Sequence, residues 1–105
     1  MEEKPKHVEY NVPLRYAPAG YRFIKPIYID IEEWENDDII AVHKPTETWA
    51  AGKRGDSVAV GLLKQQLINL YDDLVATPDE ELGKLPLQWK AFLLTHVEKI
   101  DDETK

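Results

Sequence analysis

The sequence predicts an α+β fold: a three- to four-stranded antiparallel sheet, one long helix packed across it, and a helical C-terminal tail. Short β-branched and aromatic runs separated by turn residues occupy positions 8–51, a pattern typical of antiparallel strands. Positions 57–76 instead carry apolar residues at helical spacing. The chain has 105 residues, 43% of them hydrophobic, and we expect residues 1–105 to form a single domain around one core.

Composition excludes several classes of function. The chain has 20 Asp and Glu against 13 Lys and Arg, a formal net charge of −7, so we expect no direct nucleic-acid contact and no binding to an anionic membrane. It has no cysteine, which excludes disulfides and thiol chemistry. No apolar run approaches the roughly 20 residues of a membrane span, and the N-terminus lacks the pattern of a signal peptide. We therefore expect a soluble, cytoplasmic protein.

The first predicted strand, residues 8–17, alternates apolar and polar side chains. Its apolar positions are Val8, Tyr10, Val12, Leu14 and Tyr16. Pro13 cannot donate a ladder hydrogen bond, which predicts an edge strand or an extended arm. We expect the polar residues 1–7 and 101–105 to be disordered.

Residues 22–51 are predicted to supply the rest of the sheet. Residues 22–31 form a β-branched run in which Pro26 marks the start of the strand or an edge position. Two shorter strands follow at 39–43 and 48–51. The connections between them are short, which favours an antiparallel meander, and Trp49 in the last strand is expected to be a core residue.

The long helix is predicted over residues 57–76. Its apolar stripe consists of Val60, Leu63, Leu67, Ile68, Leu70, Tyr71, Leu74 and Val75. Leu62 stands alone on the polar side. Gly55, Asp56 and Ser57 precede the helix and form a predicted helix-cap motif, in which a side chain of Asp56 or Ser57 accepts from the first turn.

Helices are also predicted for residues 77–100. Thr77 and Glu80 have the spacing of a capping box around Pro78, which predicts a short helix ending at Gly83. A last helix is expected from about residue 86 to 99. Its buried stripe is predicted to contain Trp89, Phe92, Leu93, Val97 and Ile100.

No catalytic, cofactor or metal site is predicted, so we expect a protein that is not an enzyme. The acidic run contains Asp30, Glu32, Glu33, Glu35, Asp37 and Asp38. It lacks the ligand spacing of a calcium loop and is interpreted as a solvated acidic loop; a metal-assisted hydrolase that uses these carboxylates is the least favoured alternative. His7, His43 and His96 have no metal-type spacing and are expected to be structural.

Two surfaces are candidates for protein contacts. Trp34 lies inside the acidic run, and an aromatic side chain among charges can anchor a partner. The predicted partner-binding residues are Trp34, Glu35, Asp37, Asp38 and Leu62. Tyr10, Val12, Leu14 and Tyr16 are instead candidates for self-association, by addition of their strand to a neighbouring sheet.

Residues 22–76 resemble the HicB-type antitoxin domain. The resemblance rests on three strands followed by Gly55-Asp56-Ser57-Val58 and a Leu-rich helix that ends in Leu70-Tyr71. Val60 departs from the family, which usually has a glutamate at this place. The resemblance implies a partial ferredoxin-like or nuclease-like α/β fold and a non-catalytic protein-interaction domain that neutralises a small basic toxin by binding it.

The resemblance does not extend to the DNA-binding module that regulators of this family carry, because residues 77–105 are acidic and too short to hold one. The acidic charge would suit a basic toxin. The alternative is a stand-alone, self-associating small domain without a toxin partner, and in either case we expect a homo-oligomer.

Overall fold

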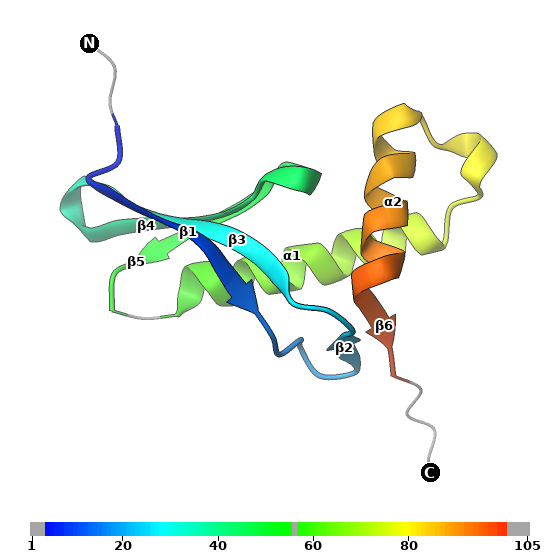
Figure 1. Cartoon of the computed structure of the whole chain (residues 1–105), viewed down its shortest axis with the longest axis horizontal. Helices are drawn as coiled ribbons and strands as arrows, with labels where there is room; N and C mark the ends of the chain where they lie inside the picture. The colour runs from blue at the N-terminus through cyan, green and yellow to red at the C-terminus, as the bar shows by residue number, and fades with distance from the viewer. Residues whose placement is uncertain (1–3, 56, 101–105) are drawn as a thin grey trace.

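A computed structural model describes residues 4–55 and 57–100 of the chain and has an α+β architecture (Figure 1). The strands are β1 His7–Leu14, β2 Tyr21–Phe23, β3 Ile27–Glu33, β4 Asp38–His43, β5 Thr48–Lys53 and β6 Val97–Lys99. The α-helices are α1 Val58–Val75 and α2 Lys84–His96. Single 3₁₀ turns occur at Glu35–Asp37, Lys44–Thr46 and Asp79–Glu81.

The main sheet has four antiparallel strands in the order β1-β3-β4-β5, so β1 and β5 are its two edges. Strands β3, β4 and β5 form the meander that the short connections predict, and α1 lies against β5 and β4. The core is the layer between α1 and the sheet. There Ile27, Ile29 and Ala41 pack against Leu63 and Leu67, all of them buried.

Strand β1 departs from the predicted alternation at a β-bulge. Between Glu9 and Val12 its pairing with β3 shifts by one residue, and Asn11 has a positive φ of 58°. The bulge changes which side chains face the core. Leu14 is buried opposite Ile27, whereas Tyr10 is 63% exposed.

The structure brings the last of the residues expected to be disordered, Lys6 and His7, into contact with the main sheet. His7 belongs to β1, and the backbone N–H of Lys6 donates to the carbonyl of Glu33 at 2.7 Å. Residues 1–3 and 101–105, for which disorder is also expected, lie outside the described residues.

The C-terminal helix ends earlier than predicted, because its last residues form a strand. Val97–Lys99 leave the helical conformation as β6 and pair antiparallel with β2 in a separate two-stranded sheet. Pairing buries Val97, whereas Ile100, expected in the helix stripe, is exposed. No local periodicity indicates this sheet, because its two strands are far apart in the sequence.

A tyrosine joins the small sheet to α1. The hydroxyl of Tyr21 donates to Asp72 Oδ2 at 2.6 Å, and its ring packs edge-on against Tyr71 at a centroid distance of 6.2 Å. The Asp72 carboxylate that accepts this hydrogen bond raises the pKa of Tyr21.

Two of the predicted capping residues, Ser57 and Thr77, do not cap the start of a helix through their side chains. Ser57 is the N-cap of α1, but its side chain makes no capping hydrogen bond, and Asp56 lies outside the described residues. Thr77 donates its hydroxyl to the carbonyl of Asp73 at 2.8 Å, so it closes the end of α1 rather than opening a new helix. The short helix predicted before Gly83 is reduced to the 3₁₀ turn Asp79–Glu81.

Most of the predicted stripe of α1 is buried or partly buried, but Val75 at its C-terminal end is 46% exposed.

No helix in the described residues is long and apolar enough to cross a membrane.

Candidate functional site

The face of the main sheet that turns away from α1 carries an unusual set of side chains. Directly opposed residues of antiparallel strands point to the same face, so the register identifies its members. We use the name open face for Tyr28, Asp30, Glu32, Ile40, Val42, Trp49 and Ala51. Tyr28 and Trp49 are 53% and 59% exposed, and Ile40 and Val42 are half-buried. An apolar surface therefore reaches solvent across neighbouring strands.

The expectation that Trp49 is a core residue is wrong. Trp49 is opposite Val42, while its neighbour Ala50 is opposite Ala41 and lies buried on the α1 side. Side chains alternate between the two faces of a strand, so the burial of Ala50 directs Trp49 to the open face. The small side chain of Ala50 leaves room for the close approach of α1.

A small pocket lies at one end of the open face. It has a volume of about 210 Å³ and is lined by Asn11, Tyr28, Asp30, Val42, Lys44 and Pro45. Asp30 Oδ1 accepts the backbone N–H of Asn11 at 3.2 Å, and Oδ2 is 3.4 Å from Lys44 Nζ. The Asp30 side chain is only 13% exposed, whereas that of Lys44 is 68% exposed. A largely buried carboxylate is thus matched by a lysine that reaches it from solvent.

The same lysine also contacts an aromatic ring. Lys44 Nζ lies 5.9 Å from the centroid of the Tyr10 ring, within the range of a cation–π contact. Lys44 therefore marks a position beside Asp30 and Tyr10 that accommodates a cationic group.

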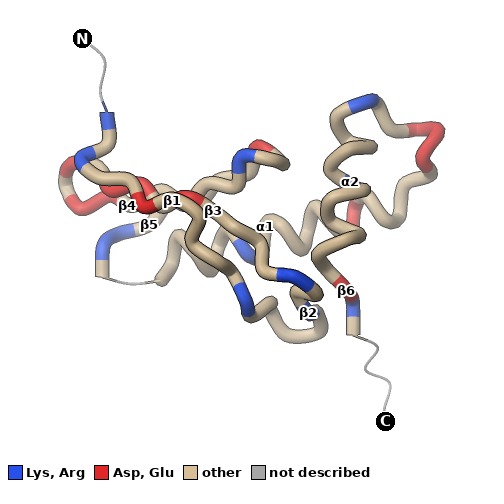
Figure 2. The backbone as a smooth tube through the Cα atoms, in the orientation of Figure 1, with Lys and Arg blue, Asp and Glu red and all other residues tan. Residues whose placement is uncertain are grey.

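The negative charges of the acidic run are paired with basic side chains more extensively than the sequence indicates. Arg54 lies 2.8 Å from Glu33, and Lys53 lies 2.5 Å from Asp38. The Asp38 carboxylate accepts a hydrogen bond from the Lys53 ammonium and raises its pKa. Figure 2 shows these basic residues at the end of β5 beside the acidic turn. The charge of the run is thus partly neutralised within the chain rather than fully solvated.

The predicted partner-binding residues do not form one surface. Trp34 is half-buried, and its indole N–H donates to Glu32 Oε1 at 2.9 Å. Asp37 lies 4.0 Å from Arg54, and Glu35 is exposed on the same turn. Leu62 lies elsewhere, on the exposed side of α1.

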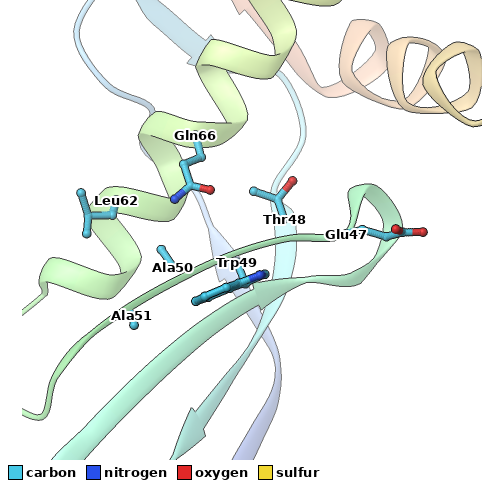
Figure 3. A pocket seen from close by; sticks show the side chains of 7 residues that line it. All are labelled: Glu47, Thr48, Trp49, Ala50, Ala51, Leu62 and Gln66. Atoms are coloured by element: carbon cyan, nitrogen blue, oxygen red, sulfur yellow. The ribbon is translucent and has the colours of Figure 1, made fainter.

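Leu62 lines a groove between α1 and the edge strand β5 (Figure 3). The groove has a volume of about 450 Å³ and is lined by Glu47, Thr48, Trp49, Ala50, Ala51, Leu62 and Gln66. The prediction that Leu62 is an exposed contact residue is compatible with this position, but its neighbours are β5 residues rather than the acidic loop.

The residues predicted for self-association are also divided. Leu14 is buried and Val12 is packed against this chain's own core, while Tyr16 is 79% exposed beyond the end of β1. Strand β1 pairs with β3 of the same chain.

The histidines occupy three different environments. His43 is 1% exposed; its Nδ1 is 2.7 Å from Thr46 Oγ1, and its ring centroid is 5.0 Å from that of Phe92. Burial, with a smaller contribution from His96, lowers the pKa of His43 to about 4. His96 stacks on Phe92 at 4.0 Å, whereas His7 is exposed. Within residues 4–55 and 57–100, no group of three or more His, Asp or Glu side chains is arranged to hold a metal ion.

Comparisons with known proteins assign no family to the chain. A scan of protein-family models finds no match, and searches of curated proteins and of solved structures find none either.

Proposed function

We propose that the chain is a non-catalytic protein-binding domain and that a partner docks on its open face. One observation supports this most directly: Trp49 and Tyr28 are exposed on the same sheet face, beside the half-buried Val42. Trp and Tyr are enriched among the residues that dominate binding energy at protein interfaces. Removing this surface from water would stabilise a complex.

The charges of the open face favour a basic partner. Asp30 and Glu32 stand on β3, one of the two inner strands, next to the apolar side chains of Val42 and Ile40 on β4. A lysine or arginine of the partner would replace Lys44 at Asp30 and form a charge-assisted hydrogen bond. The net charge of −7 would accelerate the encounter with such a protein.

A small basic toxin is the partner class that the resemblance to HicB-type antitoxins implies. In this proposal the chain neutralises the toxin by covering its active surface, and the chain itself performs no reaction. The resemblance is supported by the three-strand meander that precedes a Leu-rich helix, and the acidic composition suits a basic toxin. The open face adds a surface on which the toxin would sit.

The test begins with capture of the partner by the tagged chain from an extract of its own organism. A stoichiometric basic protein, identified by mass spectrometry, is then purified and its affinity is measured by calorimetry. We expect Tyr28→Ala to weaken binding by about tenfold or more. Tyr16→Ala is the matched control, because it removes the same side chain from an exposed position outside the sheet.

Recovery of the bait alone would overturn the proposal, and so would equal affinities of the two tyrosine variants for the captured protein. Circular dichroism checks that both variants are folded, so that a loss of affinity reports on the surface.

A further inference from the structure

The two edges of the main sheet differ in their protection against further pairing. Strand β1 carries Pro13 and the bulge at Asn11, two devices that discourage the addition of another strand. Strand β5 has the sequence Thr-Trp-Ala-Ala-Gly-Lys, with no proline, and its register with β4 runs without a shift. The only charge within β5 is Lys53, at its end. β5 is therefore the edge that is suited to pairing.

We propose that two copies of this chain associate through β5, antiparallel and centred on Ala50, so that their main sheets form one continuous eight-stranded sheet. In a twofold antiparallel pair the hydrogen-bonding pattern requires a residue to lie opposite its own copy. One residue of β5 must therefore lie at the twofold axis, and we compare registers in which this residue is Trp49, Ala50 or Ala51.

Charge complementarity selects Ala50 as the centre. This register brings Glu47, the turn residue with positive φ directly before β5, level with Lys53 of the second copy, and the twofold axis repeats the contact at the other end of the interface. Centring on Trp49 would place Glu47 opposite Ala51, and centring on Ala51 would place Trp49 opposite Lys53. Opposite charges across strands are stabilising, and like charges are destabilising.

Side-chain size fits the same register. Ala50 meets its copy at the axis, and Trp49 lies opposite the second copy's Ala51, so each bulky indole has a small neighbour. The two Trp49 side chains are diagonal neighbours, a separation that aromatic rings can bridge. Contacts of Trp49 would thereby remove part of its exposed area from water.

The groove beside α1 supplies a second layer of contacts. With Ala50 opposite its copy, both α1 helices lie on the same face of the joined sheet. Leu62 and Gln66, which line the groove above Ala50 (Figure 3), then face the equivalent side chains of the second helix. Leu62 is 48% exposed in the single chain, and this contact would cover it.

The joined sheet also has a consequence for the proposed partner surface. The two open faces become one continuous face, because both α1 helices lie on the opposite side. Self-association would thus double the area available to a partner, while Tyr28, which lies on β3 away from the edge, would contribute nothing to the dimer itself.

Sedimentation equilibrium of the full chain tests this inference by charge exchange. The wild-type chain is expected at twice its 12.1 kDa mass with a concentration-dependent monomer fraction. Glu47→Lys, which sets lysine against Lys53, is expected to raise the dimer dissociation constant about tenfold. The double variant Glu47→Lys with Lys53→Glu restores the opposite pair across the interface. Because Lys53→Glu also sets a glutamate beside Asp38 of its own chain, the double variant is compared with Lys53→Glu alone and should associate more tightly than that single variant.

Glu80→Lys is the matched control, because it makes the same charge change at an exposed site on the Asp79–Glu81 turn. It should leave the dissociation constant unchanged, as should Tyr28→Ala. Thermal unfolding confirms that every variant is folded. A wild-type chain that is monomeric at all concentrations would overturn the inference. A dimer that Glu47→Lys does not weaken, or a double variant that associates no more tightly than Lys53→Glu alone, would equally exclude pairing centred on Ala50.

Discussion

Gly52 and Ala59 are in such close contact that a β-carbon placed on Gly52 would lie 2.7 Å from the backbone nitrogen of Ala59. Gly52 belongs to β5 and Ala59 to the first turn of α1. The side chain of Ala59 is itself buried. The absence of a side chain at Gly52 therefore allows the beginning of the long helix to lie directly on the edge strand.

Gly52→Ala is accordingly expected to destabilise the fold by roughly 1–3 kcal/mol, the usual cost of overpacking, because the obstructing atom belongs to the backbone and cannot rotate away. Urea unfolding measures the change. Gly61→Ala is the matched control: apart from the backbone of its own helix, nothing lies within 4 Å of an added β-carbon, and replacing a helical glycine should stabilise by roughly 0.5–1 kcal/mol. Equal effects of the two substitutions would contradict the contact.

The buried imidazole of His43 predicts a loss of stability in mild acid. The pKa of His43 is lowered to about 4 in the fold, from 6.5 for an unburied imidazole. The unfolded chain therefore binds a proton at higher pH than the folded chain does. The contribution of the neutral His43 to the free energy of unfolding is fully present above about pH 6.5. It is lost progressively as the pH falls from 6.5 toward 4.

The expected decrease in the free energy of unfolding is roughly 2 kcal/mol between about pH 7 and about pH 5. Burial is the main cause of the lowered pKa of His43, whose ring lies against Phe92 and whose Nε2 has no hydrogen-bond partner among the described residues; charge repulsion from His96 adds a smaller contribution. Urea unfolding at both pH values should show a smaller decrease for His43→Gln. His7→Gln, at an exposed position, should keep the wild-type decrease; a His43→Gln variant that also keeps it would exclude the imidazole as the source.

Two leucines with different burial predict different contributions to stability. Leu63 of α1 is 0% exposed, whereas Leu94 of α2 is 49% exposed. Leu63→Ala should cost about 2–5 kcal/mol, because it leaves a cavity between helix and sheet. Leu94→Ala should cost no more than about 0.5 kcal/mol. Chemical denaturation compares the two, and a small effect at Leu63 would contradict the packing of α1 on the sheet.

The local elements of the main sheet and its helix could be predicted well. Hydrophobic periodicity places the long helix at 57–76, close to the observed Val58–Val75, and Pro26 directly precedes β3 as its position suggests. These predictions succeed because the periodicity of a helix or strand is a property of neighbouring residues.

The candidate site could not be predicted in the same way. Trp49 is as apolar as a core residue, and only its pairing with Val42 directs it to the open face. The acidic run is compensated by Lys53 and Arg54, which follow it by a full hairpin in the sequence. Neither relationship has a signal within a short window of residues.

The sequence by itself determined the α+β class, the existence of the meander and the long helix, and the absence of cysteine chemistry. Tertiary structure alone decided that Val97–Lys99 pair with β2, that the β1 edge is bulged while β5 is regular, and that aromatic residues occupy the face away from α1. The physical reason is that the spacing of apolar residues along a helix or strand is a local property of the sequence. The environment of each side chain depends instead on which distant strand its own strand pairs with, and in which register.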